Sequence, residues 1–160
     1  MRLRWAIWII WMGLLSCEEQ FGIDDNEPSQ SVIDISTRLF KGDVLEKLSV
    51  IEDNVEVWKI KIKNENGAII SFYWQKNYNI VFKIVGEQGP FNYDIQPPLN
   101  VLPLSTARFL AFESYSEEKL SSWILKRDTA EENRWIYQFF INGNESPFTI
   151  NARSGDVIYS

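Results

Sequence analysis

Apolar and polar residues alternate along residues 57–64, where "VWKIKIKN" places Trp58, Ile60 and Ile62 on one side and three lysines on the other. This period of two predicts a half-buried β-strand whose lysine side faces water. Runs rich in β-branched and aromatic residues predict further strands, at 68–75, 79–85, 119–127, 134–141, 146–152 and 156–160. Short glycine- and asparagine-rich runs predict hairpin turns, at 65–67, 142–144 and 153–156.

Two other stretches have the period of a helix. In "LSTARFLAFESY" (104–115) an apolar stripe follows one side, and Ser105 can cap the start. The stretch 31–48 is less regular, and Gly42 either splits it or ends it. Between the two sheet regions, residues 89–103 carry four of the six prolines, which predicts an extended linker.

The two sheet regions resemble each other. Trp58 and Trp135 lie 135 − 58 = 77 residues apart, and the same ungapped offset aligns the strands that follow each tryptophan. A single internal duplication explains these coincidences. The sequence therefore predicts an α+β fold of two tandem units, each a helix packed on an antiparallel β-sheet. The units would span 33–88 and 104–160, with 89–103 as the linker.

The N-terminal segment 1–16, "MRLRWAIWIIWMGLLS", has two arginines followed by the uncharged apolar run Trp5 to Leu15. That run has 15 − 5 + 1 = 11 residues, whereas a membrane-spanning helix needs about 20. The pattern is typical of a signal peptide. A short buried helix of the mature domain is the alternative, although the charged "CEEQ" that follows directly argues against it.

Cys17 is the only cysteine, so it has no partner for an internal disulfide. The segment "LLSC" resembles a bacterial lipobox, with Leu14 three residues before the cysteine and Ser16 directly before it. The resemblance implies cleavage between Ser16 and Cys17, acylation of the Cys17 thiol, and a membrane partnership through that lipid anchor. A secreted protein with a free thiol is the alternative.

Residues 17–32 are acidic and polar, which predicts a flexible, charged, lipidated tether. Glu18 and Glu19 directly follow the cysteine. They resemble the signal that some Gram-negative groups use to send lipoproteins to the outer surface. That resemblance implies a lipid-anchored protein of the cell envelope, at the outer membrane and facing either the periplasm or the surface. A merely solvated tether explains the same residues.

Composition limits the function classes. The chain has 160 residues, of which 45% are apolar, enough to build the core of one medium domain or two small ones. Its net charge is −6, without a basic cluster. Because neutralisation of phosphates dominates nucleic-acid affinity, we expect no nucleic-acid partner.

Groups that carry catalysis are scarce in this sequence. Histidine, the commonest general base, is absent. Adjacent acidic pairs at 24–25, 117–118 and 131–132 lie in predicted loops or the tether, where a solvated surface explains them. No calcium-loop spacing and no glycine-rich phosphate loop occurs. We therefore expect no catalytic residue, no metal site and no cofactor, and a hydrolase with oxygen-only metal ligands is the enzyme alternative.

The end of the chain resembles the closing hairpin of the PepSY module, a helix followed by an antiparallel sheet. In "INARSGDVI" (150–158), Gly155 is the structural turn residue, because glycine permits positive φ. Val157 and Tyr159 are expected to pack inward and fix the register. The resemblance covers 104–160. Tandem modules of this kind are grouped with the β-lactamase inhibitor protein, so the resemblance implies a binding or inhibitory role.

The resemblance is looser over 33–88, where Tyr78 stands at the turn-glycine position. Aromatic residues there and in the second unit offer candidate contacts. Tyr73 and Trp74 are adjacent, as are Phe140 and its neighbour, so each pair puts one ring on each side of its strand. A helix covers only one side, which leaves Tyr73, Trp74 and Phe140 as candidate binding aromatics. The alternatives are that the two sheets pack on each other or that the first helix covers these residues.

Taken together, these features predict a lipid-anchored, non-catalytic extracytoplasmic binding protein. Its partner would be a protein or peptide held by the sheet faces, and a protease or enzyme inhibitor is one form of that function. The alternative is a structural or assembly lipoprotein of the cell envelope without inhibitory activity.

Overall fold

The computed structural model describes residues 27–112, 119–131 and 133–158. The elements are, in order, α1 (Gln30–Phe40), β1 (Gly42–Glu52), β2 (Val55–Asn64), β3 (Ile69–Gln75), β4 (Ile80–Gln88), α2 (Leu104–Phe112), β5 (Leu120–Arg127), β6 (Trp135–Ile141), β7 (Phe148–Asn151) and β8 (Val157–Ile158). Each strand that the sequence predicts is present, although several boundaries shift by one to three residues.

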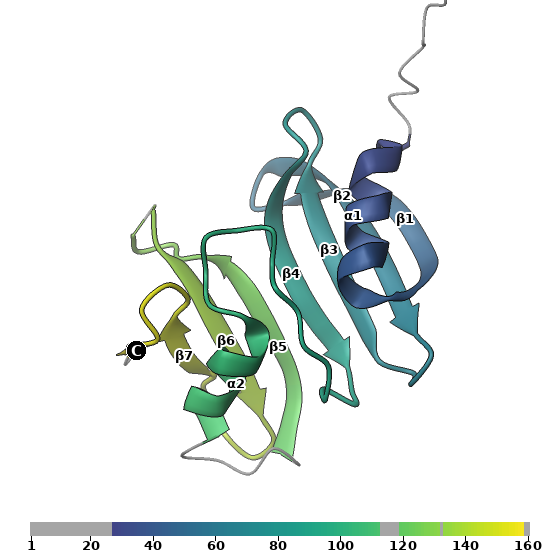
Figure 1. The fold of residues 1–160 in the computed structure, drawn as a ribbon. Coiled ribbons are helices and arrows are strands. Elements are labelled where there is room, and N and C mark those ends of the chain that lie inside the picture. Colours follow the sequence, from purple (N-terminus) through teal and green to yellow (C-terminus); the bar gives the residue numbers. More distant parts are fainter. Residues whose placement is uncertain (1–26, 113–118, 132, 159–160) are drawn as a thin grey trace, which may run out of the picture.

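All eight strands form one antiparallel sheet in chain order, from β1 at one edge to β8 at the other (Figure 1). The N-terminal half (α1 and β1–β4) joins the C-terminal half (α2 and β5–β8) where β4 pairs with β5. The prediction of two tandem helix-on-sheet units is therefore wrong, because the sheet is continuous and, in the described residues, carries only two short helices. Pairing β4 with β5 satisfies two strand edges that separate sheets would leave open.

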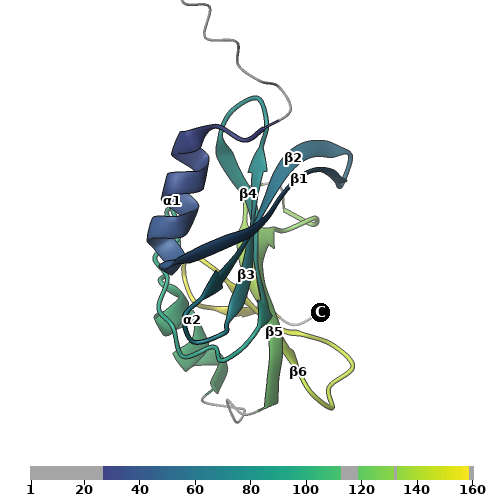
Figure 2. The same cartoon turned by 90° about the vertical axis from the view of Figure 1, so that its right-hand side faces the viewer.

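Both helices lie on the same face of the sheet, which Figure 2 shows edge-on. Helix α1 packs on β1, β2 and β3, and α2 packs on β7. The apolar side of β2, with Trp58, Ile60 and Ile62, is buried in the core beneath this layer. The alternation therefore identified the core side of this strand correctly.

The predicted helical stretch 31–48 divides into a helix and a strand. Helix α1 ends at Phe40, Lys41 adopts a left-handed conformation with φ 52°, and β1 begins at Gly42. A Cβ on Gly42 would lie 2.5 Å from the carbonyl oxygen of Lys63 on β2. Glycine at this position thus allows the chain to leave the helix and pair at once with β2.

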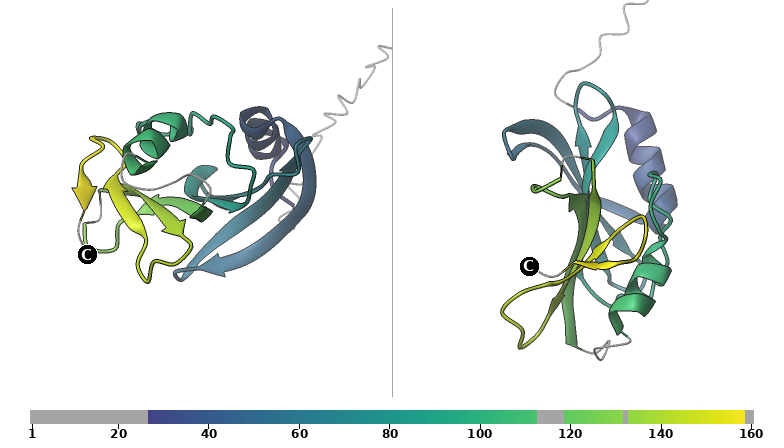
Figure 3. Two further views of the ribbon diagram at one scale, coloured as in Figure 1. Left: turned by 90° about the horizontal axis from the view of Figure 1, so that it is seen from below. Right: turned by 90° about the vertical axis from the view of Figure 1, so that its left-hand side faces the viewer.

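The predicted linker 89–103 has no helix or strand up to α2, and it lies between the two helices on the same face of the sheet (Figures 1 and 3). Phe91 and Ile95 are buried in the core. The Tyr93 ring meets the Phe40 ring edge-on at 4.8 Å between centroids. Burial raises the pKa of Tyr93. The segment therefore fills the space between α1 and α2 rather than acting as an open spacer.

A close approach at the β4–β5 seam joins the halves. Trp123 is fully buried on β5, and its Nε1 donates to the hydroxyl of Tyr93 at 2.8 Å. The indole lies against Gly86 of β4, where an added Cβ would be 2.0 Å from Nε1. With Phe40 packed on Tyr93, residues from both halves and from the linker form one aromatic column.

The closing hairpin has the predicted pairing, with Thr149 opposite Ile158 and Ile150 opposite Val157. Gly155 has φ +83°. The prediction that Val157 is a core residue is wrong, because its side chain is 40% exposed. The physical reason is that β8 is a two-residue edge strand with a neighbour on one side only. Tyr159 lies outside the described residues.

Candidate functional site

The face of the sheet opposite the helices, called here the open face, is the candidate site. The ends of the β1–β2 and β6–β7 hairpins project on this side (Figure 2). Strand pairing sets which residues share the face, because directly opposed residues point the same way. Two rows of paired residues cross this face. The first row consists of Leu48, Lys59, Tyr73, Lys83, Lys126 and Ile136. The second row consists of Glu46, Lys61, Ser71, Val85, Ile124, Gln138, Thr149 and Ile158.

Tyr73 occupies the centre of the open face in the N-terminal half. The Lys83 Nζ lies 4.3 Å from its ring centroid, and the Lys59 Nζ lies 5.8 Å from it. These cation–π contacts and the lysine stems leave Tyr73 only 7% exposed. Burial, assisted by the negative charges of Glu52 and Glu87, raises the pKa of Tyr73 to about 12.

Ion pairs surround this tyrosine. Glu87 accepts from the Lys61 Nζ at 2.7 Å and from the Ser71 Oγ at 2.6 Å, and the Lys59 Nζ lies 3.5 Å away. Burial of Glu87 favours its neutral form, but the hydrogen bonds from Lys61 and Ser71 outweigh burial and lower its pKa. The charges on this half of the face are therefore largely satisfied within the protein.

The β1–β2 hairpin bends over the open face. Glu52 lies at the end of β1, yet its carboxylate accepts from the Lys83 Nζ on β4 at 2.6 Å. Two strands separate β1 from β4 in the sheet, so this contact requires the hairpin to curl across β3, as Figure 3 shows. The hairpin thus covers part of the open face in the N-terminal half.

The open face of the C-terminal half has a different character. Ile124 on β5 and Phe140 on β6 are half-buried, and Ile158 on β8 is also partly exposed. The neutral Gln138 lies opposite Ile124. Among the described residues, no helix covers this part of the face (Figure 2). This part of the face therefore presents partly exposed apolar side chains among polar ones, without the ion pairs found around Tyr73.

The structure separates the three candidate aromatics. Trp74 is on the helix side, 2% exposed, and its Nε1 donates to the Ser36 Oγ of α1 at 3.0 Å. It is therefore part of the core and not open to a partner. Tyr73 is on the open face but shielded, whereas Phe140 is on the open face and partly exposed. Ser16 and Cys17 lie outside the described residues.

Three residues that complete this face were not predicted from the sequence pattern: Lys59, Lys61 and Ile124. The alternation along β2 predicted that Lys59 and Lys61 face water, but both form ion pairs with Glu87, a residue of β4. Ile124 was not singled out either, although it follows the core residue Trp123 on a strand and so belongs to the opposite side. The alternation along β5 could therefore have placed Ile124 on the open face. The alternation along β2 could not have identified Glu87 as the partner of Lys59 and Lys61.

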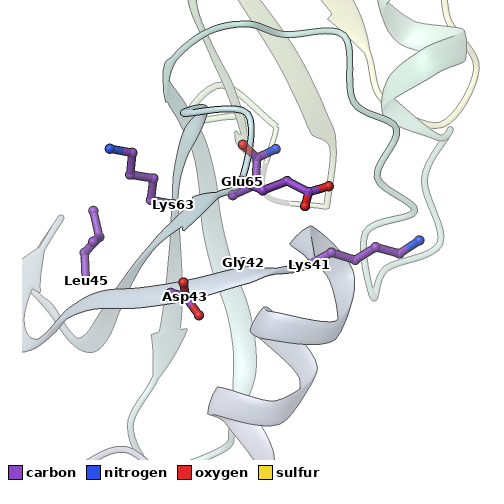
Figure 4. Close-up of a pocket in the computed structure, with 7 residues that line it drawn as sticks. Lys41, Gly42, Asp43, Leu45, Lys63 and Glu65 are labelled. Carbon is purple, nitrogen blue, oxygen red and sulfur yellow. The ribbon is translucent and has the colours of Figure 1, made fainter.

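A separate hollow of about 480 Å³ lies where α1 meets β1, lined by Lys41, Gly42, Asp43, Leu45, Lys63, Asn64 and Glu65. Figure 4 shows Lys41 and Lys63 extending in different directions, so the two charged groups do not converge on one point. Among the described residues, no group of three or more histidine, cysteine or acidic side chains is placed to hold a metal ion. Neither helix of the described ranges has the length and apolarity to span a membrane.

No family model and no curated protein matches this chain. The fold comparison finds a crystal structure of a candidate lipoprotein from Clostridium difficile 630, with a TM-score of 0.35 and 16% sequence identity. The match covers 84% of this chain and 91% of that chain. The resemblance to PepSY modules stays a prediction drawn from residues 104–160.

Proposed function

We propose that this chain is a lipid-anchored, non-catalytic binding protein of the cell envelope whose binding surface is the open face of the C-terminal half. The observation that carries the proposal is the pair of half-buried apolar side chains Ile124 and Phe140 on a face that no described helix covers. Its partner is a protein or peptide that presents apolar side chains to this surface.

The chemistry of the two halves of the face favours this location. Burial of apolar surface stabilises a complex by roughly 25 cal/mol per Å² before the costs of association are subtracted. Aromatic residues often contribute strongly to the affinity of an interface, and Phe140 is a partly exposed aromatic residue on this face. In contrast, the lysines around Tyr73 already have acidic partners, and a ligand would have to displace them.

The anchor is the second part of the proposal and rests on the sequence. "LLSC" at 14–17 follows an apolar run too short to span a bilayer. Cys17→Ala should move the chain from the detergent phase to the aqueous phase in a phase-separation assay. A wild-type chain already in the aqueous phase would exclude a lipid anchor. The inhibitory role that the PepSY resemblance implies stays a prediction.

The binding surface is tested by photocrosslinking in cells. A photoreactive phenylalanine analogue replaces Phe140 in one variant and Phe109 in the control, since Phe109 is 66% exposed but on α2, in the helix layer. We expect a discrete adduct from position 140 that Ile124→Lys abolishes, and no such adduct from position 109. Equal crosslinking from both positions, or none from position 140, would rule out this surface.

A further inference from the structure

The two edges of the sheet are built differently. Within the described residues, which end at Ile158, edge strand β8 has two residues, whereas edge strand β1 has eleven. A long edge presents a row of unpaired backbone donors and acceptors, and short strands are one way in which proteins avoid unwanted pairing. A bulge between Val44 and Glu46 interrupts the start of β1, but pairing with β2 is regular from Glu46 to Glu52. Among the residues that the structure describes, none pairs with the outer edge of β1, so this edge can accept another strand.

Large apolar side chains gather on this edge strand. Leu45, Leu48 and Ile51 are 52%, 43% and 73% exposed. Three of the seven large hydrophobic residues that are exposed in the described part of the chain thus lie on β1. Single exposed apolar residues are ordinary, but three along one edge strand indicate an interaction site.

We propose that this edge pairs with β1 of a second copy of the chain, antiparallel and across a two-fold axis, to form a continuous sheet. Directly opposed residues in a sheet share a face, so a symmetric pair must be centred on a residue. The occupant is a second copy because one such register of this strand is complementary to itself.

That register is centred on Leu48, so that opposed residue numbers sum to 2 × 48 = 96. Leu48 then meets Leu48 of the second copy, and Leu45 meets Ile51. The charged residues meet uncharged ones, Glu46 opposite Val50 and Lys47 opposite Ser49. All three exposed apolar residues of the strand become contacts, and no like-charge pair is opposed over residues 44–52. Asp43 falls opposite Asp53, which lies beyond the end of β1 in the left-handed conformation (φ 49°) and so is not held in strand pairing.

The adjacent registers are worse. Centring on residue 47 places Lys47 opposite itself. Centring on residue 49 places Glu46 opposite Glu52, because 46 + 52 = 2 × 49. Like charges directly opposed across strands are destabilising. Charge therefore selects the register centred on Leu48 over its neighbours.

Crosslinking tests the geometry on the full chain in detergent. Opposed residues of antiparallel strands have Cα atoms about 4.5–5.5 Å apart, within reach of a disulfide. Leu48→Cys should form a disulfide-linked dimer on mild oxidation. The controls are wild type, with its single Cys17, and Val157→Cys on the other edge. Dimer formation by a control to the same extent as by Leu48→Cys would overturn the proposal.

Sedimentation of the same full-length preparations supplies the second measurement. Leu48→Lys opposes two like charges at the axis, and because Leu48 is already 43% exposed the fold should tolerate the lysine. We expect self-association at least tenfold weaker than in wild type. The matched control Tyr78→Lys, at an exposed turn position away from β1, should associate as wild type does. A monomeric wild type, or a Leu48→Lys variant that associates normally, would overturn the proposal.

Discussion

The N-terminal and C-terminal halves have the same order of elements, a helix followed by four strands, but they differ in strand length and surface chemistry. The offset of 77 residues places β2 against β6, β3 against β7 and β4 against β8. Strands β1 to β4 have 11, 10, 7 and 9 residues, whereas β7 and β8 have 4 and 2. In the described residues, the strands of the C-terminal half therefore become shorter toward β8.

The longer strands of the N-terminal half have a structural consequence. The end of the β1–β2 hairpin reaches over the open face and joins Glu52 to Lys83 above Tyr73. The described part of the C-terminal half contains no hairpin of this length, and its Ile124 and Phe140 are partly exposed. Strand length thus determines which part of the open face is closed by the chain itself and which part is available to a partner.

The largest expected effect comes from the seam that joins the halves. In Gly86→Ala, the new Cβ would lie 2.0 Å from Nε1 of Trp123, which is far inside van der Waals contact. Overpacking of this kind against a buried indole should lower the free energy of unfolding by about 3 kcal/mol or more. Chemical denaturation followed by tryptophan fluorescence measures it. A single cooperative transition is expected because one sheet spans both halves.

Gly143→Ala is the control for the seam. Gly143 has φ +92° and nothing within 4 Å of an added Cβ, so only backbone strain of about 1 kcal/mol is expected. If Gly86→Ala costs no more than this control, or if it unfolds the two halves in separate steps, the seam is not the structural link described above.

The next largest effect distinguishes the turns before β4 and β8. Gly155→Ala should cost about 1–2 kcal/mol, because φ is +83° and the Cβ would lie 2.7 Å from the mobile Leu110 Cδ1. In the turn before β4, Asn79 supplies positive φ at 49°, and asparagine tolerates this conformation. Asn79→Gly should therefore change the free energy of unfolding by less than about 0.5 kcal/mol. Thermal denaturation of both variants compares the two turns.

A smaller, pH-dependent effect tests the charged half of the open face. The pKa of Glu87 is lowered from 4.5 in the folded protein, so its contribution to stability is present above pH 4.5 and is lost as pH falls through the folded pKa. Glu87→Gln should cost about 1 kcal/mol at neutral pH, because hydrogen bonds to charged groups contribute about 1.5–3 kcal/mol and the partial exposure of Glu87 to water reduces that contribution. Lys61→Gln should reduce the same acid-side loss. The free energy of unfolding is measured by denaturation at several acidic pH values. The explanation would be contradicted if it fell with decreasing pH as steeply in both variants as in wild type.

The smallest effect is expected at the short edge. Val157→Ala should lower the free energy of unfolding by less than about 0.5 kcal/mol, because the side chain is 40% exposed and little burial is lost. Denaturant midpoints measured beside wild type are sufficient. A loss of 2 kcal/mol or more, as for a buried valine, would show that β8 is packed more tightly than its exposure indicates.

Local structure was largely predictable from the sequence, because alternation and turn residues act over a few positions. The core side of β2 and the hairpin that ends at β8 are examples. The β4–β5 pairing was not predictable, since Gln88 and Leu120 are separated by a helix and a packed linker and no local pattern encodes their contact. The shielding of Tyr73 was also missed, because it depends on how far the β1–β2 hairpin curls.

The turn before β4 shows a different limit. Tyr78 at the glycine-equivalent position cast doubt on a tight turn, but the adjacent Asn79 adopts the left-handed conformation instead. This kind of turn requires one residue with positive φ, but that residue need not be a glycine at one fixed position of the motif. Sequence comparison by residue identity at one position therefore misjudges turns in which the neighbour takes over the role.

The strand order of the sheet, in which every strand pairs with the next along the chain, has a kinetic consequence. Loop closure between consecutive hairpin strands is inexpensive, and chains dominated by short-range contacts fold quickly. During synthesis, each new strand can pair with the free edge of the strand before it. The longest segment between consecutive strands is the one from Gln88 to Leu120, so the pairing of β5 with β4 requires the largest loop closure. We expect that step to limit the folding rate.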